Sequence, residues 1–176
     1  MTDGSRLLHI HTLYDYSAWA NARILAAASP LTLEPLNAPG DGAYGSVRET
    51  LVHTMSAQRG WLARWRSPLP VVPPTGRLDP ADFPDVAAIR ARWDDIERAT
   101  RAYLADLTGE DLDRVVTYVS SSGQTWSYPL WQQLIHLVNH GTQHRSEVAA
   151  LLTRYGRSPG DLDLLVFVDE RRAGPG

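Results

Sequence analysis

The chain has 176 residues, of which 43% are hydrophobic and 21% are charged, with a net charge of −3 and a pI near 6.0. These values predict one globular domain and argue against a nucleic-acid partner. The sequence has no apolar run near 18 residues and no apolar signal-peptide core at its start, so we expect no membrane partner and a cytoplasmic location.

Two residue types are absent. The sequence has no Cys, which excludes thiolate nucleophiles, disulfides and zinc sites with cysteine ligands. It has no Lys either, because all 17 basic residues are Arg, and this excludes Schiff-base chemistry and a P-loop lysine. Metal ligands must therefore come from His, Asp or Glu.

The first half of the chain predicts two helices. Residues 4–28 show helical spacing of apolar residues, and the Pro- and Gly-rich stretch 35–45 follows them. The second helix is predicted over 46–65, where Ser46 and Glu49 match a capping box. His53 in this helix lies among small residues, which leave room on its face for another helix or a bound group.

A long connection separates the second helix from the third. Residues 66–84 hold six prolines, which is typical of an extended segment and not of a tight turn. Such a segment can cross the length of a bundle, so the helices on either side can run parallel. The third helix is predicted over 85–107, with a solvated face of mixed acidic and Arg residues.

The last part predicts a β-hairpin and the longest helix. Residues 113–128 alternate and turn over at SSSG, which indicates two extended arms. Pro129 is placed at the first position of a helix over 129–156. We therefore predict an all-α fold, a four-helix bundle with a proline-rich crossover between helices 2 and 3 and a short hairpin before helix 4. The single domain 1–176 has its core at about 4–156 and a C-terminal extension at 157–176, which contains a second apolar segment.

Three histidines recur at i, i+4 in the last helix. His136, His140 and His144 lie one turn apart, and His140 and His144 share a stripe with apolar residues. A metal ion or core hydrogen bonds would satisfy buried imidazoles. His136 and His144 are about 12 Å apart along the helix, too far to ligate one ion together. A metal would therefore bind either His136 and His140 or His140 and His144. The third ligand must come from another helix, where His53 is the candidate.

Three neutral imidazoles suit zinc, nickel or ferrous iron and leave positions open for substrate. The motif H-G-T-Q-H is not a metalloprotease motif, because Gly141 stands at the position of the catalytic glutamate. Glu147 is either a ligand in place of His53 or, the interpretations we favour, an acceptor for an imidazole N–H or part of a surface ion pair. No Ser-His-Asp arrangement is evident.

Three stretches make the chain resemble the DinB/YfiT-like family of metal-binding four-helix bundles. They are YDYSAWANARIL (14–25), ETLVHTMSAQRGWL (49–62) and LIHLVNHGTQHRSEVAALL (134–152), and the last is the most specific. The resemblance spans about residues 7–155. It implies that His53, His140 and His144 ligate one divalent metal, zinc or nickel, with His136 outside the site. It also implies a homodimer.

The resemblance implies an activity as well. Characterised relatives include S-transferases and isomerases that use low-molecular-weight thiols such as mycothiol, bacillithiol or glutathione. The leading hypothesis is therefore a metal-dependent enzyme that joins a thiol to a small-molecule substrate. The alternatives are a metal-dependent hydrolase and a non-catalytic metal-binding stress-response module. Many relatives carry an acidic residue four positions after the first histidine, where this chain has Ala57.

Overall fold

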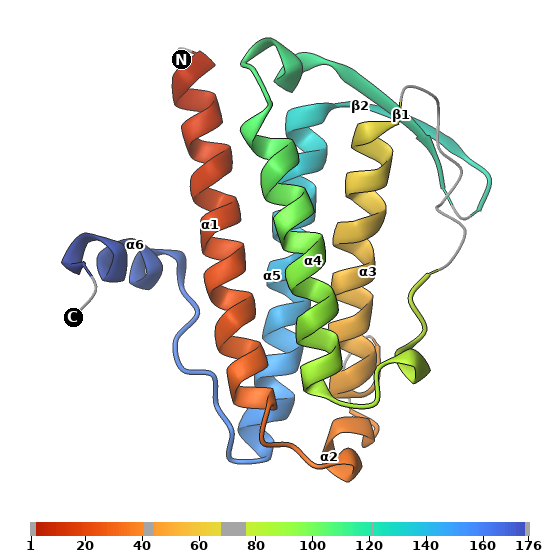
Figure 1. Ribbon diagram of the computed structural model, residues 1–176, viewed down its shortest axis with the longest axis vertical. Coiled ribbons are helices and arrows are strands. Elements are labelled where there is room, and N and C mark those ends of the chain that lie inside the picture. Colours follow the sequence, from red (N-terminus) through yellow and green to blue (C-terminus); the bar gives the residue numbers. More distant parts are fainter. Residues whose placement is uncertain (1–2, 41–43, 68–76, 121, 175–176) are drawn as a thin grey trace.

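Four long helices lie side by side in the computed structural model, which describes residues 3–40, 44–67, 77–120 and 122–174 (Figure 1). The helices are α1 (Asp3–Ala28), α3 (Val47–Arg66), α4 (Val86–Ala105) and α5 (Leu130–Arg154). This arrangement confirms the predicted four-helix bundle. All four predicted helix ranges agree with the observed bounds to within two residues at each end.

The helices run in an unusual order of directions. Figure 1 shows α1 and α5 running one way and α3 and α4 the other. Contacts between α3 and α4 agree, because Gln58 contacts Trp93 early in α4 and Arg66 contacts Ala99 later. The two consecutive helices are therefore parallel, which the long connection between them allows. Residues 68–76 of that connection lie outside the described part of the chain.

Side-chain caps fix where the helices begin. The predicted capping box is present: Glu49 N–H donates to Ser46 Oγ at 3.2 Å, and Ser46 N–H donates to Glu49 Oε2 at 2.9 Å. Asp85 caps α4 by accepting the Ala88 N–H at 2.8 Å. Gly156, with φ +68°, follows α5 in the left-handed conformation that favours glycine.

The hairpin is present, but the start of the last helix differs from the prediction. Strand β1 (Val115–Val119) pairs antiparallel with β2 (Thr125–Pro129). Pro129 was expected at the first helical position, yet it pairs with Val115 as the last strand residue and precedes α5 as its N-cap. The strand continues to Pro129 because the following Leu130 N–H donates to Arg114 O, which ties the chain to β1.

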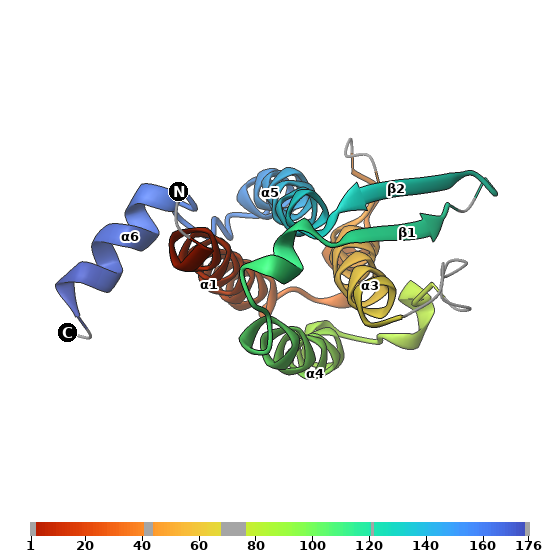
Figure 2. The same ribbon diagram turned by 90° about the horizontal axis from the view of Figure 1, so that it is seen from above.

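The C-terminal extension forms a helix of its own, α6 (Leu164–Ala173), where only an apolar segment was predicted. Phe167 packs against Tyr16 and Trp19 of α1. Arg171 pairs with Asp15 at 2.6 Å, and Glu170 pairs with Arg23. Figure 2 shows α6 lying outside the bundle on the α1 side. The division into core and extension stays a prediction.

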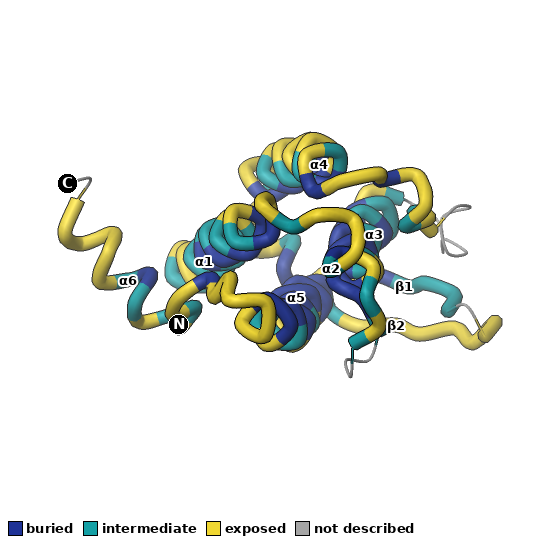
Figure 3. The backbone as a smooth tube through the Cα atoms, turned by 90° about the horizontal axis from the view of Figure 1, so that it is seen from below, coloured by how far each residue is buried: buried dark blue, intermediate teal, exposed yellow. Residues whose placement is uncertain are grey.

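The buried residues of the bundle face inward from all four long helices, and α6 is mostly exposed (Figure 3). Short elements close the ends: α2 (Leu33–Asn37), η1 (Pro80–Asp82) and η2 (Glu110–Asp113). Among the described residues, no helix is long and apolar enough to cross a membrane.

Candidate metal centre

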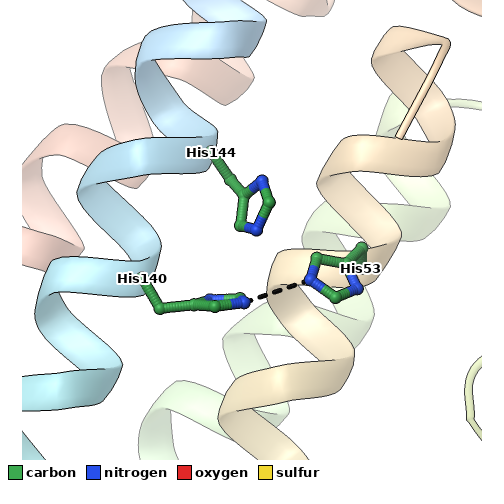
Figure 4. Close-up of side chains that lie close together, drawn as sticks. All are labelled: His53, His140 and His144. Carbon is green, nitrogen blue, oxygen red and sulfur yellow. Dashed lines mark hydrogen bonds between the residues drawn. The ribbon is translucent and has the colours of Figure 1, made fainter. Parts of the chain in front are cut away.

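Three imidazoles converge between α3 and α5. His53 comes from α3, and His140 and His144 come from successive turns of α5 (Figure 4). The Nε2 atoms of His53 and His140 are 3.1 Å apart, and one nitrogen from each ring lies within 4.8 Å of the other two. His144 is buried, and the other two are half-buried. The structure thus brings together the three residues that the sequence proposed as ligands.

His136 and His9 lie outside this cluster. His136 is exposed one turn earlier on α5, and its ring centroid is 6.1 Å from that of His140. It packs edge-on against Trp61 at 5.3 Å. His9 is exposed on α1.

Glu147 orients the most buried ring. Its Oε2 lies 2.7 Å from His144 Nδ1, so the carboxylate accepts the Nδ1 proton. This contact leaves Nε2 of His144 with its lone pair free. The structure therefore favours Glu147 as an acceptor behind the histidine and not as a replacement for His53. Such carboxylate–histidine pairs fix the tautomer and raise the basicity of a metal ligand.

Two residues at His53 were not found from the sequence. Tyr44 stacks on the imidazole with ring centroids 3.6 Å apart and planes 18° apart. Arg77 Nη2 lies 3.0 Å from His53 Nδ1. Both lie outside the helices, Tyr44 before α3 and Arg77 before η1, so neither falls on the periodic pattern of a helix, and no sequence signal marks them.

The Arg77 contact determines where the His53 proton sits. Arginine has only donors, so Nδ1 accepts and the proton of the neutral ring lies on Nε2. That proton is donated to His140 Nε2. A metal ion needs the lone pair of His53 Nε2, so metal binding requires the other tautomer and the release of the Arg77 contact.

The environment keeps two of these imidazoles neutral. Burial and the neighbouring His140 and His144 lower the pKa of His53 to about 3. Burial, with His144 and His136 nearby, lowers the pKa of His140 to about 4. Both rings are therefore uncharged at neutral pH, which is the form that a metal ion binds.

The donor set fits a divalent ion. In a tetrahedral zinc site with bonds of 2.0–2.1 Å, the ligand nitrogens are about 3.3 Å apart. Here the His53 and His140 Nε2 atoms are 3.1 Å apart and all three ring nitrogens lie within 4.8 Å of one another, so the observed separations bracket that value. His140 Nδ1 is buried with no hydrogen-bond partner among the described residues, and it is Nε2 of this ring that faces His53.

A pocket opens beside the cluster. Its volume is about 370 Å³, and its lining includes His53, Tyr44 and Arg77. The two acids in its lining are both held by backbone groups, since Glu49 completes the cap of α3 and Asp79 accepts the Ala81 N–H. Among the described residues, the pocket wall thus offers a cation and an aromatic ring but no free carboxylate.

Replacing Glu147 with Ala is expected to weaken divalent-metal affinity about 10–100-fold, because His144 would lose the group that fixes its tautomer. Competition with a chromophoric chelator measures the affinity. The matched control is Glu34→Ala, at an exposed acid on α2. Equal affinity in the Glu147 and Glu34 variants would contradict the assigned contact.

The fold and the cluster together define the class: a four-helix bundle with a candidate three-histidine metal centre between two of its helices. A DinB family profile matches residues 1–173, so the chain belongs to the DinB family. It is 24% identical to Protein DinB of Bacillus subtilis strain 168 over 159 residues, which are 89% of this chain and 92% of that protein.

Two solved structures share the fold. YfiT from Bacillus subtilis, described as a probable metal-dependent hydrolase with an unusual four-helix bundle topology, superimposes with a TM-score of 0.65 at 19% identity. The match covers 90% of this chain and 91% of YfiT. A conserved protein from Enterococcus faecalis superimposes with a TM-score of 0.55 at 14% identity. This match covers 80% of this chain and 92% of the Enterococcus protein.

Proposed function

We propose that the chain is a divalent-metal-dependent enzyme that joins a low-molecular-weight thiol to an electrophilic small molecule. The observation that supports this most is the convergence of His53, His140 and His144 beside a pocket. A divalent ion held by these residues, zinc or nickel, supplies Lewis-acid chemistry that lowers the pKa of a bound thiol. His144, oriented by Glu147, and the neutral His53 and His140 would hold that ion.

The residues around the pocket support thiol transfer over other reactions. A thiolate attacks without a general base, and both acids in the pocket lining are already bound to backbone groups. Position 57, where many relatives carry an acid, is alanine. Arg77 becomes available for an anionic substrate group once it leaves His53, since a guanidinium pairs well with carboxylates.

The test uses mycothiol, bacillithiol and glutathione, each with monochlorobimane as the acceptor. The thiolate sulfur forms the new C–S bond, chloride leaves with the electron pair, and the thiol proton goes to solvent. We expect turnover with at least one thiol that requires added zinc or nickel and is lost in His144→Ala. Absence of metal-dependent turnover with all three thiols would contradict the proposal.

A hydrolase is the second candidate, favoured by the description of YfiT as a probable metal-dependent hydrolase. Water then replaces the thiol as the nucleophile. Hydrolysis of p-nitrophenyl acetate or p-nitrophenyl phosphate without any thiol would distinguish it. Failure of both assays, with metal still bound, would leave the non-catalytic metal-binding module.

The homodimer implied by family resemblance is a separate proposal. Leu8, Trp131 and Ile135 are exposed, and the last two line an apolar groove of about 330 Å³ between α1 and α5. Such a surface is typical of an interface. A single-chain mass in sedimentation equilibrium would contradict the dimer. The cytoplasmic location stays a prediction.

A further inference from the structure

A second cavity, of about 300 Å³, lies where the hairpin meets α3 and α5. Figure 1 shows β1 and β2 next to the ends of these two helices. The volume is at the lower end of the range for small-molecule sites. The lining is mostly aromatic or amide-bearing: Trp61, Tyr118, Tyr128, Gln132, Gln133 and His136.

The walls of this aromatic pocket are held in place. Trp61 meets Tyr118 edge-on with centroids 5.1 Å apart. The amide of buried Gln133 donates to Val116 O at 2.9 Å and to Tyr128 O at 3.2 Å, which fastens the hairpin to α5. A planar group could therefore enter between rings that need little ordering.

Arg64 does not itself line the cavity, but its guanidinium lies against two of the lining rings. Its guanidinium lies 4.7 Å from the Trp61 ring centroid and 4.9 Å from that of Tyr118. Within the described part of the chain, no carboxylate pairs with this guanidinium, and its Nε is buried with no hydrogen-bond partner. Burial lowers the pKa of Arg64, which reflects the unfavourable removal of the charge from water. An anion beside the two rings would satisfy the guanidinium.

The aromatic pocket adjoins the candidate metal centre. His136 forms part of its wall, and this ring is 6.1 Å from the His140 ring, centroid to centroid. On α3, Trp61 follows His53 by about two turns. A molecule in the aromatic pocket would therefore lie about one helical turn from His140 and about two turns from His53 and His144.

We propose that this pocket binds a planar aromatic carboxylate, with the ring against Trp61 and Tyr118 and the carboxylate paired with Arg64. A carboxylate is the anion that a planar guanidinium matches with two parallel hydrogen bonds. The role of this molecule as the electrophilic substrate rests on the proposed function. The binding of this molecule to the pocket does not depend on the proposed function.

The test is calorimetric titration of the full chain with three carboxylates and their neutral amides. The probes are benzoate, 2-naphthoate and indole-3-acetate, measured with and without added zinc. We expect saturable binding of at least one carboxylate, with the matched amide at least about tenfold weaker. Arg64→Gln should abolish this preference, whereas Arg92→Gln, at an exposed residue of α4, should keep it.

Three results would overturn the proposal: no saturable binding of any carboxylate, equal binding of acid and amide, or an unchanged preference in a folded Arg64→Gln variant. The acid–amide comparison on the unmodified chain needs no variant and so remains decisive if that variant fails to fold. Binding that persists without metal or turnover supports the pocket while the proposed function fails. Metal-dependent thiol transfer without carboxylate binding leaves the proposed function standing and overturns the pocket.

Discussion

The chain purified without a histidine tag is expected to contain about one divalent ion, and His53→Ala and His144→Ala are each expected to lose it. Loss of an orienting partner alone lowers metal affinity about 10–100-fold, so loss of a direct ligand should exceed about 100-fold. Each variant leaves only two imidazoles in the cluster, so the ion loses one of its three protein ligands. Elemental analysis after gel filtration measures the metal content.

His136→Ala is the matched control for this experiment. It removes an imidazole from the same face of α5, one turn from His140, but its ring lies against Trp61 and outside the cluster. Retention of metal in His53→Ala and His144→Ala would show that the three rings are a hydrogen-bonded core group. Loss of metal in His136→Ala would show that the ligand set is wrong.

The periodic parts of this centre could be predicted from the sequence. The i, i+4 spacing placed His140 and His144 on one face, and it excluded His136 from sharing an ion with His144. The capping box at Ser46 fixed the start of α3 and thereby the height of His53 along the bundle. That His53 faces His140 depends on how α3 and α5 pack, which spacing within one helix does not determine.

Tyr44 and Arg77 could not be predicted because they lie outside regular helix and strand patterns. Tyr44 precedes α3 in a Pro- and Gly-rich stretch, and Arg77 follows the proline-rich connection. Their contacts with His53 are tertiary, with no fixed sequence offset. The same holds for α6, whose contacts with α1 join residues more than 140 positions apart.

Two charged residues of α4 differ from the prediction of a solvated face, although Arg92, Asp94, Asp95 and Arg98 are exposed as predicted. Glu97 and Arg101 do form an i, i+4 pair, at 2.6 Å, but both are only partly exposed. Arg101 also pairs with Asp15 on α1, and Glu97 accepts a hydrogen bond from Gln58 on α3. The pattern of charges along α4 predicted the local i, i+4 pair. It could not predict the network that joins α4 to α1 and α3.

Replacing Gln58 with Leu is expected to lower the free energy of unfolding by about 3 kcal/mol. The buried amide donates to Glu97 at 2.7 Å and to Thr100 at 3.2 Å, and it accepts from Trp93 Nε1 at 2.8 Å. Leucine fills a similar volume but leaves the Trp93 N–H unpaired, and an unsatisfied buried group costs about 1–3 kcal/mol in addition to the lost hydrogen bonds. Urea unfolding measures the change, with an unchanged slope if only stability is affected.

The control is Gln143→Leu on the exposed face of α5, which should stay within about 0.5 kcal/mol of the unmodified chain. The folded Gln58→Leu variant should still bind metal, because residue 58 lies more than one helical turn from His53 on α3. If Gln58→Leu has the same unfolding free energy as the control, the hydrogen bonds of Gln58 contribute no more stability than the apolar packing of a leucine at this position. A loss near 3 kcal/mol would instead show that these polar contacts stabilise the packing of the parallel helices α3 and α4.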